Sequence, residues 1–258
     1  MILTIDIGNT TIGFSGMKRC GASDYESVFN IKTRTIKDES KQHYAKIMNK
    51  ELGTYVNEIE GAIISSVVPS LTEKLQKGVE DLTGRPVLVL DSSLDLGLTS
   101  GVDDLKKVGL DRLADAAWAA EKYPLPVVTV DIGTATTFNV IDSNKVFRGG
   151  AIAPGVATGI QALAGRTSQL EAVKVRNPKG VIGKNTEECM LIGMVTGTAA
   201  MIDGLTARFE VEIGEKASLV LTGGLSEWIA PLCSHLLIRD PLMLSKGLAL
   251  IYDRNQRF

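Results

Sequence analysis

The 258-residue sequence predicts an α/β protein made of two related halves, each a mixed sheet with helices on its faces. Two observations support this prediction. A short motif occurs twice, about half a chain apart, and a similar order of strands and helices follows each copy. The composition agrees, because 44% of the residues are apolar and 22% are charged, which is ordinary for a globular chain long enough to bury a large core.

The repeated motif is an Asp-x-Gly turn between two β-branched strands. Residues 3–11 are Leu-Thr-Ile-Asp-Ile-Gly-Asn-Thr-Thr, and residues 128–137 are Val-Thr-Val-Asp-Ile-Gly-Thr-Ala-Thr-Thr, an offset of 125 residues (3 to 128). A second strand follows each turn, over 11–15 and 137–141, and a third strand is predicted over 146–152. One match would be weak, but two matches with a shared element order favour duplication over coincidence.

The hydrophobic pattern predicts the remaining elements. The first half should contain helices near 40–52 and 71–82 and strands over 62–68 and 86–90. A helical run over 113–121 follows. The second half should contain helices near 156–163 and 186–209, strands over 219–222 and 236–238, and a closing helix over 241–254. A cleft between two such halves is a common place for a ligand site.

Charge and cysteine content narrow the function classes. The formal net charge is −2, so no basic field suits a polyanion such as nucleic acid. Cys20, Cys189 and Cys233 are far apart and odd in number, which argues against a disulfide framework and for a reducing compartment. Two histidines without a Cys-x-x-Cys spacing argue against zinc. The sequence shows neither a signal peptide nor an apolar run approaching about 18 residues, so we expect a cytoplasmic protein without a membrane partner.

The two turns have the chemistry of a phosphate site. No G-x-x-x-x-G-K-[ST] or G-x-G-x-x-G motif occurs, so a nucleotide would be held by other means. Gly8 allows close backbone approach, and residues 9–11 add neutral donors. Asp6 and Asp131 would repel bare phosphate unless a cation lay between them. Each aspartate could instead serve only its own turn, but the pair favours a clamp for a nucleotide–cation complex.

These motifs resemble those of type III pantothenate kinases, within the superfamily of actin, heat-shock chaperones, and acetate and sugar kinases. The resemblance covers nearly the whole chain. Its segments are Asp6-Ile7-Gly8-Asn9-Thr10, Val108-Gly109-Leu110-Asp111-Arg112, residues 131–137, the Gly-Gly-Ala-Ile-Ala-Pro-Gly of 149–155, Gly183-Lys184-Asn185-Thr186 and Thr222-Gly223-Gly224. The Asp-x-Gly turn is shared by the superfamily, whereas Gly-x-Asp-Arg and Gly-Gly-x-Ile-x-Pro-Gly are far more specific.

The resemblance implies two duplicated ribonuclease H-like domains of the actin-like ATPase type, over 1–112 and 113–258, with a cleft between them. It implies ATP-dependent phosphorylation of pantothenate to 4'-phosphopantothenate, the first step of coenzyme A biosynthesis, by a cytoplasmic homodimer. Two alternatives remain open. One is another small-molecule kinase of the superfamily, and the other is a non-catalytic ATP-binding accessory protein.

The resemblance also assigns the nucleotide and cation sites. Asp131 would hold a monovalent cation, K⁺ or NH₄⁺, and Mg²⁺ would accompany ATP. The residues implied to contact ATP are Asp6, Ile7, Gly8, Asn9, Thr10, Thr11, Ile12, Gly13 and Thr134.

The acceptor site is implied in the same way. Asp111 would be the general base for the primary hydroxyl of pantothenate, and Thr186 would reach pantothenate from the partner subunit. The residues implied to line the acceptor site are Gly109, Leu110, Asp111 and Arg112.

The residues alone leave other roles open. Asp111 precedes a helical run, as a helix N-cap would. Arg112 could grip a ligand carboxylate or pair with Asp115, and Thr186 lies in a capping sequence. The small residues Gly193, Gly197 and Ala200 could serve a dimer interface or packing within one subunit.

Three positions depart from the family pattern. The run 101–107 lacks the Tyr and Pro that commonly precede Gly-x-Asp-Arg, which leaves the acceptor less secure than the kinase chemistry. Asn139 stands where Asp is frequent and could weaken cation binding. Leu110 replaces a small residue and looks tolerable.

Overall fold

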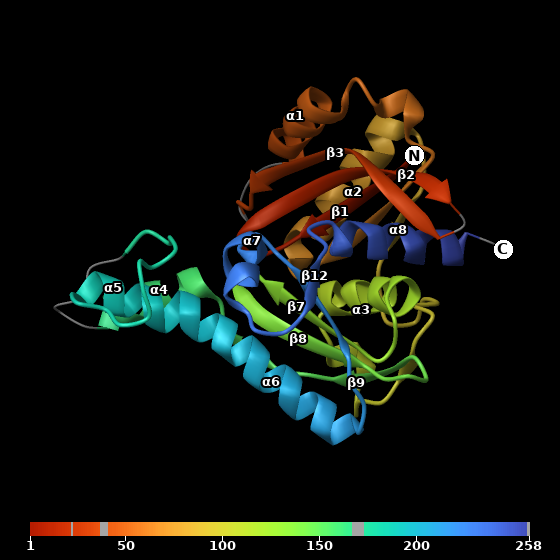
Figure 1. Ribbon diagram of the computed structural model, residues 1–258. Coiled ribbons are helices and arrows are strands. Elements are labelled where there is room, and N and C mark those ends of the chain that lie inside the picture. Colours follow the sequence, from red (N-terminus) through yellow and green to blue (C-terminus); the bar gives the residue numbers. More distant parts are fainter. Residues whose placement is uncertain (22, 37–40, 167–172, 257–258) are drawn as a thin grey trace. The chain divides into compact units, whose positions relative to one another are not determined.

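The computed structural model describes residues 1–21, 23–36, 41–166 and 173–256. Contacts within the chain divide it into two compact units (Figure 1). Unit 1 comprises Met1–Leu98, Asp103–Lys122 and Met243–Phe258, and unit 2 comprises Thr99–Val102 and Tyr123–Leu242.

This division differs from the predicted boundary between residues 112 and 113. Helices α3 (Leu110–Lys122) and α8 (Met243–Asn255) both belong to unit 1. The two helices pack closely, because a Cβ on Gly247 of α8 would lie 2.1 Å from the carbonyl oxygen of Ala114 in α3. Helix α8 in turn packs on strands of unit 1. The C-terminal helix therefore returns to the N-terminal sheet, which a division by sequence order misses.

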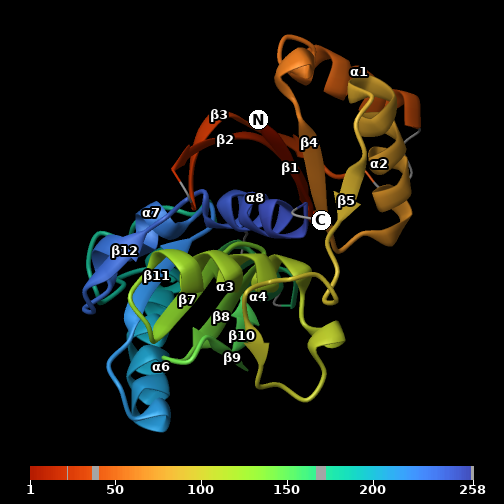
Figure 2. The ribbon, with the colours of Figure 1, turned by 90° about the vertical axis from the view of Figure 1, so that its right-hand side faces the viewer.

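Unit 1 contains a five-stranded mixed sheet with helices on both faces. In sheet order its strands are β3 (Asp24–Arg34), β2 (Thr11–Gly21), β1 (Ile2–Ile7), β4 (Gly61–Ser66) and β5 (Val87–Val89). Helices α1 (Lys41–Leu52) and α2 (Pro69–Thr83) pack together on one face, as Figure 2 shows, and bury Ile5 and Ile7. Helix α8 packs on β1, β2 and β4.

The hairpin of β2 and β3 is longer than predicted. The sequence predicted a second strand over 11–15 only, whereas β2 continues to Gly21 and pairs with β3 throughout. Register shifts interrupt the pairing between Gly16 and Met17 and between Arg19 and Gly21. Such irregularities break the alternation of apolar and polar residues by which a strand is predicted.

Unit 2 contains the second mixed sheet. Its strands in sheet order are β12 (Leu237–Arg239), β11 (Ser218–Thr222), β7 (Val127–Ile132), β8 (Ala135–Ile141), β9 (Val146–Gly149) and β6 (Thr99–Ser100), and β10 (Ile152–Pro154) also pairs with β8. Its helices are α4 (Val156–Arg166), α5 (Thr186–Leu191), the π-helix η3 (Ile192–Thr196), α6 (Gly197–Ile213) and α7 (Ser226–Ile229). Short 3₁₀ turns over Val56–Glu58, Leu105–Lys107 and Ala230–Leu232 complete the elements.

The two sheets share one central arrangement, which confirms the predicted duplication of mixed sheets. Strand β1 pairs antiparallel with β2 and parallel with β4, and β7 pairs antiparallel with β8 and parallel with β11. Asp6 lies opposite Ser65 in the parallel pair of unit 1, and Asp131 lies opposite Thr222 in that of unit 2. Both aspartates therefore lie near the carboxyl end of the equivalent strand.

One long helix of unit 2 corrects a sequence prediction. Elements α5, η3 and α6 form a continuous helix, Thr186–Ile213, which is long and apolar enough to cross a membrane by length and composition. The prediction that no apolar run approaches this length is therefore wrong. Leu191, Val195 and Ile202 of this helix are buried in the unit 2 core, as in the core helix of a globular unit.

Candidate active site

The first repeated turn is a tight hairpin with an exposed tip. The N–H of Gly8 donates to the carbonyl oxygen of Thr11 at 3.0 Å. A Cβ on Gly8 would lie 3.1 Å from that same oxygen, so a glycine lets the hairpin close this tightly. The side chains of residues 9–11 are exposed, as donors to a phosphate must be.

The implied ATP contacts of this turn divide into two kinds. Ile7 and Ile12 are opposite one another across the hairpin, and their side chains are fully buried in the unit 1 core. These two residues can therefore offer only backbone groups to a ligand. Gly13 lies opposite Asp6, and both are half-buried.

The second turn is one residue shorter and is supported by the Pro-Gly motif. The N–H of Gly133 donates to the carbonyl oxygen of Ala135 at 3.0 Å, and Thr134 is exposed at the tip. Gly155 lies against this turn, since a Cβ there would be 2.2 Å from the Gly133 carbonyl oxygen. The glycine is required because the start of α4 passes directly beside the turn.

Gly223 leaves space for Asp131 in the way that Gly155 leaves space for the second turn. Its φ of +89° lies in the left-handed region that favours glycine. A Cβ there would lie 2.3 Å from Oδ1 of Asp131 and 2.6 Å from the Ile132 carbonyl oxygen. The Thr-Gly-Gly segment thus places its backbone against the carboxylate, together with a neighbouring carbonyl.

Two kinds of oxygen lie beside Gly223. A Cβ there would be close to a carboxylate oxygen of Asp131 and to the carbonyl oxygen of Ile132, which also accepts the N–H of Leu225 at 3.4 Å. Over the described ranges, no three His, Cys, Asp or Glu side chains gather as metal ligands. Asn139 is directed elsewhere, because its buried amide donates to Oγ1 of Thr129 at 3.0 Å.

Asp111 lies inside helix α3 and not at its cap. The helix begins at Leu110, and the Gly109 carbonyl accepts the N–H of Leu113 at 3.2 Å. Gly109 is therefore the N-cap residue, and the interpretation of Asp111 as the cap is wrong. Oδ1 of Asp111 accepts the N–H of Arg112 at 2.8 Å. A Cβ on Gly109 would lie 2.5 Å from that oxygen, so a side chain there would displace the carboxylate.

Arg112 places a positive charge beside Asp111. The half-buried guanidinium has its pKa lowered by desolvation, and the negative charge of Asp111 opposes this shift. A partly desolvated guanidinium interacts more strongly with a carboxylate than a fully solvated one does. Arg112 and Asp111 thus bring opposite charges together at the start of α3.

Packing within unit 1 brings Asp111 to the same end of the sheet as Asp6. Helices α3 and α8 run side by side, with Ala114 next to Gly247 and an ion pair of 2.9 Å between Glu121 and Arg254. Oγ of Ser245, near the start of α8, lies 3.0 Å from Oγ of Ser15 on β2. A Cβ on Gly61, at the start of β4, would collide with Tyr252, near the end of α8. The first turns of α8 and α3 therefore point toward the carboxyl end of β1, where Asp6 lies.

The segment that lacks the family Tyr and Pro has its own local structure. Strand β6 ends at Ser100, and a 3₁₀ turn over Leu105–Lys107 follows. Asp104 caps this turn, since its Oδ1 accepts the N–H of Lys106 at 3.0 Å. An acceptor wall at this place would be built from different side chains than in the family pattern.

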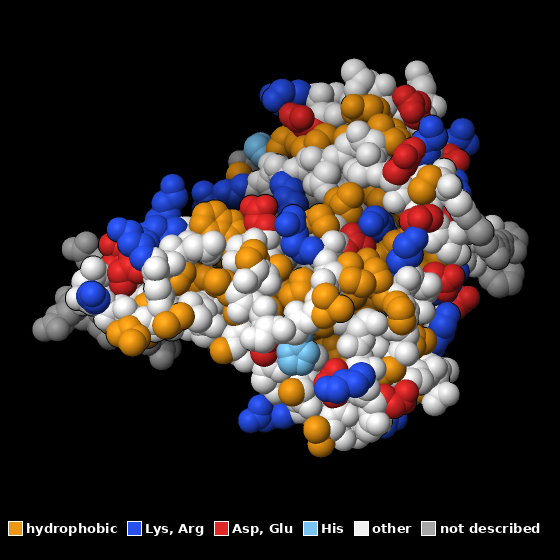
Figure 3. All heavy atoms as spheres, in the orientation of Figure 1, with side chains coloured by type: hydrophobic (Ala, Val, Ile, Leu, Met, Phe, Trp, Pro, Cys, Tyr) orange, Lys and Arg blue, Asp and Glu red, His pale blue; other side chains and the backbone are white. Residues whose placement is uncertain are grey.

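Thr186 is the first residue of α5 and is exposed. The predicted capping sequence is confirmed with Asn185 as the cap, because its Oδ1 accepts the N–H of Glu188 at 2.9 Å. Figure 3 shows basic and acidic side chains together on the end of unit 2 that carries α5. Arg176 contributes to this mixed charge by pairing with Glu187 and Glu188.

Comparison with known proteins agrees with these motifs. The family model for type III pantothenate kinase matches residues 2–208. The chain belongs to this family. Proteins named type III pantothenate kinase from Exiguobacterium sibiricum and Moorella thermoacetica are 35% and 33% identical to it, over 99% of this chain and 100% of each relative. Each of these alignments therefore spans nearly all of this chain and the whole of the relative.

Solved structures confirm the fold class of this type III pantothenate kinase family member. A ROK family glucokinase from Streptomyces griseus, in complex with glucose and AMPPNP, is similar with a TM-score of 0.54 and 14% identity, over 99% of this chain and 100% of that one. A Campylobacter jejuni protein assigned to the Baf family of transcriptional activators has a TM-score of 0.62 at 20% identity, over 99% and 100%. At these identities the likeness shows the fold alone, which is the predicted actin-like ATPase fold.

Three glycines have roles that the sequence motifs did not reveal. Gly109, Gly155 and Gly223 each leave space for a backbone or a carboxylate of the site. Their presence in the family motifs was visible, but the group that each one adjoins is distant in sequence or set by side-chain geometry.

We predict that Gly223→Ala strongly reduces turnover, because the added methyl collides with the Asp131 carboxylate. A displacement of about 1 Å in a catalytic group can lower a rate about 100-fold. Gly214→Ala is the matched control, since Gly214 has a φ of +77° in the same unit but no atom within 4 Å of its Cβ position. Steady-state rates of both variants, with thermal unfolding of each, check the prediction. Equal losses of activity in the two variants would show that backbone strain, and not the collision, decides the effect. Full activity in Gly223→Ala would contradict the prediction.

Proposed function

We propose that this protein transfers the γ-phosphoryl group of ATP to the primary hydroxyl of pantothenate, which yields 4'-phosphopantothenate in the first step of coenzyme A biosynthesis. Membership of the family supports this proposal. The observation that carries it for this chain is the placement of Asp111, half-buried at the end of the unit 1 sheet where the Asp6 turn lies. A kinase needs this pairing of a base with a phosphate turn.

Each residue then has a chemical task. Asp111 accepts the hydroxyl proton as the acceptor oxygen attacks the γ-phosphorus and the bond to ADP breaks. Arg112 pairs with the pantothenate carboxylate, which orients the acceptor, and Gly109 and Leu110 line the same place. Residues 6–13 and Thr134 contact ATP, and the exposed turn residues 9–11 and Thr134 offer backbone N–H and hydroxyl groups to its phosphates. Mg²⁺ bound with ATP would neutralise phosphate charge.

We assign the monovalent cation site to Asp131. Its carboxylate and the Ile132 carbonyl would be ligands for K⁺ or NH₄⁺ beside Gly223. A cation there would offset the repulsion between Asp131 and the ATP phosphates. The three thiols, none of them in a disulfide, suit a reducing cytoplasm.

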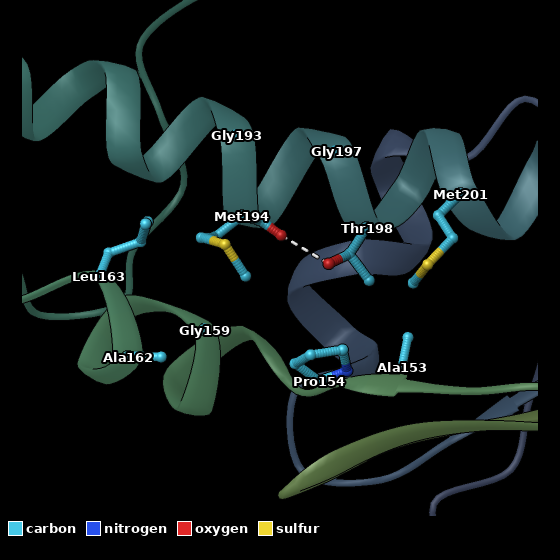
Figure 4. Close-up of a pocket in the computed structure, with 10 residues that line it drawn as sticks. All are labelled: Ala153, Pro154, Gly159, Ala162, Leu163, Gly193, Met194, Gly197, Thr198 and Met201. Carbon is cyan, nitrogen blue, oxygen red and sulfur yellow. Dashed lines mark hydrogen bonds between the residues drawn. The ribbon is translucent and has the colours of Figure 1, made fainter. Parts of the chain in front are cut away.

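We infer that the protein is a homodimer that uses the long helix of unit 2. Gly193, Gly197 and Ala200 form an exposed stripe on this helix. A Cβ on Gly193 would meet nothing within 4 Å, so packing within one subunit does not explain the small residues. Gly193 and Gly197 line a largely apolar groove of about 490 Å³. Figure 4 shows that the side chains of Met194 and Met201 point into this groove.

A second copy of the chain suits this surface, because exposed apolar patches mark interaction sites and most soluble oligomers are symmetric homo-oligomers. Val181 and Ile182 are 76% and 82% exposed just before Thr186. A partner that covers them would lie next to Thr186, which the family resemblance implies reaches pantothenate in the partner subunit.

Asp111→Asn should keep the fold and lose about 100-fold or more of the turnover, because an amide cannot accept the proton. The matched control is Asp91→Asn, which changes an exposed aspartate of unit 1 whose Oδ1 accepts the N–H of Ser93. Rates of ADP release with pantothenate, together with circular dichroism, check both variants. A near-wild-type rate in Asp111→Asn would show that Asp111 is not the base.

The dimer proposal predicts complementation between two inactive variants. Asp111→Asn removes the base, and Thr186→Arg blocks the acceptor site of the partner. Co-expressed with different tags and purified through both, the two chains should form mixed dimers in which one site of the two has both wild-type residues, giving about half the wild-type rate. Absence of any recovery in purified mixed dimers would show that Thr186 acts within its own subunit.

A further inference from the structure

Each repeated turn is anchored by a segment outside the motif. In unit 1 this segment is Thr35, the residue directly after β3. Its Oγ1 donates to the Gly8 carbonyl oxygen at 2.7 Å, and its N–H donates to the Thr10 carbonyl oxygen at 3.0 Å. Thr35 therefore holds two carbonyls of the first turn.

The second turn is anchored in the same manner. Thr158, in the first turn of α4, donates its Oγ1 proton to the Thr134 carbonyl oxygen at 2.7 Å. The N–H of Gly155 donates to that same oxygen at 3.0 Å. Two donors thus fix a single carbonyl at the tip of the second turn.

The backbone part of the two anchors corresponds between the units. Arg34 of β3 lies opposite Thr11 of β2, and Pro154 of β10 lies opposite Ala135 of β8. In each case the next residue donates its N–H to the turn. The hydroxyls do not correspond, because Thr35 matches Gly155 in this alignment and Thr158 comes from a helix. The two hydroxyls also bond different carbonyls, that of Gly8 in unit 1 and that of Thr134, the equivalent of Thr10, in unit 2. Each turn nevertheless has a carbonyl held by a threonine hydroxyl from outside the motif, which points to a shared requirement.

The anchors decide where the turn N–H groups point. In a trans peptide the C=O and N–H are directed oppositely, and the one cis bond among the described residues is Leu125-Pro126. Because Thr35 donates hydrogen bonds to the carbonyls of Gly8 and Thr10, these carbonyls point toward Thr35. The N–H groups of the next residues, Asn9 and Thr11, therefore point away from it. The donors on Thr134 direct the N–H of Ala135 away from α4 in the same way.

We propose that Thr35 and Thr158 are positioning residues that aim the N–H groups of Asn9, Thr11 and Ala135 at phosphate oxygens of ATP. Successive backbone N–H groups form an anion site, and donors fixed beforehand need no reorganisation when the ligand binds. The inference rests on the proposed function, since it takes ATP as the ligand of both turns.

The test compares Thr35→Val and Thr158→Val with Thr35→Ser and Thr158→Ser. Valine keeps the shape but removes the donor, whereas serine keeps the donor. Each valine variant should bind Mg-AMPPNP about threefold to tenfold more weakly in calorimetry, the loss expected for one hydrogen bond. The KM for ATP should rise by a similar factor while the KM for pantothenate stays unchanged. The serine variants should retain wild-type values.

Thr83→Val is the matched control. Oγ1 of Thr83 donates to the Val79 carbonyl oxygen at 2.8 Å at the end of α2, and this variant should bind Mg-AMPPNP as the wild type does. Thermal unfolding of every variant distinguishes a loss of stability from a loss of nucleotide affinity. Because Thr35 and Thr158 lie in separate units, the two substitutions test the inference independently.

Two results would overturn the inference in different ways. If the valine variants bind Mg-AMPPNP normally while Thr10→Asp and Thr134→Asp, which add negative charge at the exposed turn tips, bind it weakly, the turns hold the nucleotide but the threonines do not position them. If Thr10→Asp and Thr134→Asp also bind normally, ATP is not the ligand of these turns, and the proposed nucleotide site fails together with the inference.

Discussion

The register between the first strand of each unit and its two neighbours determines everything else in the site. Strand β1 lies between antiparallel β2 and parallel β4, and β7 lies between β8 and β11. Burial of side chains such as Ile5 and Ile7, worth about 1.5–3 kcal/mol each, fixes this register, because a slip of one residue would turn every side chain to the other face. Asp6 is thereby held on the face opposite these isoleucines, at the strand end where the turn begins.

Glycines and threonines then shape the turn at each fixed strand end, where we propose that phosphate binds. Gly109, Gly155 and Gly223 each admit a group that a methyl would exclude, and Thr35 and Thr158 hold the turn carbonyls from behind. No lysine is needed for this design, since oriented amides supply the positive ends of dipoles. In the proposed site, Asp6, Asp111 and Asp131 supply the negative charge that the proposed base and cation site need.

Local patterns predicted much of this structure. The Asp-x-Gly repeat, with its β-branched flanks, marks both strand ends, and the helix over 113–121 and the capping sequence before Glu188 were visible as short-range signals. Long-range packing was not visible in these local signals. The return of α8 to unit 1 depends on Gly247 meeting Ala114, and the anchoring by Thr35 depends on strand pairing across a hairpin longer than predicted. Asp111 was misjudged as a cap because helix starts are uncertain by a residue or two.

The most direct test of the account is the initial rate of ADP release with and without pantothenate, in potassium buffer and in sodium buffer. The account predicts that release requires pantothenate and is much faster in potassium, because Asp111 needs an acceptor proton and Asp131 needs a monovalent cation of the right size. Tight ATP binding with no stimulation by pantothenate would contradict the assigned acceptor, and would direct attention to the Val102–Lys107 segment. Equal rates in the two buffers would contradict the cation role of Asp131.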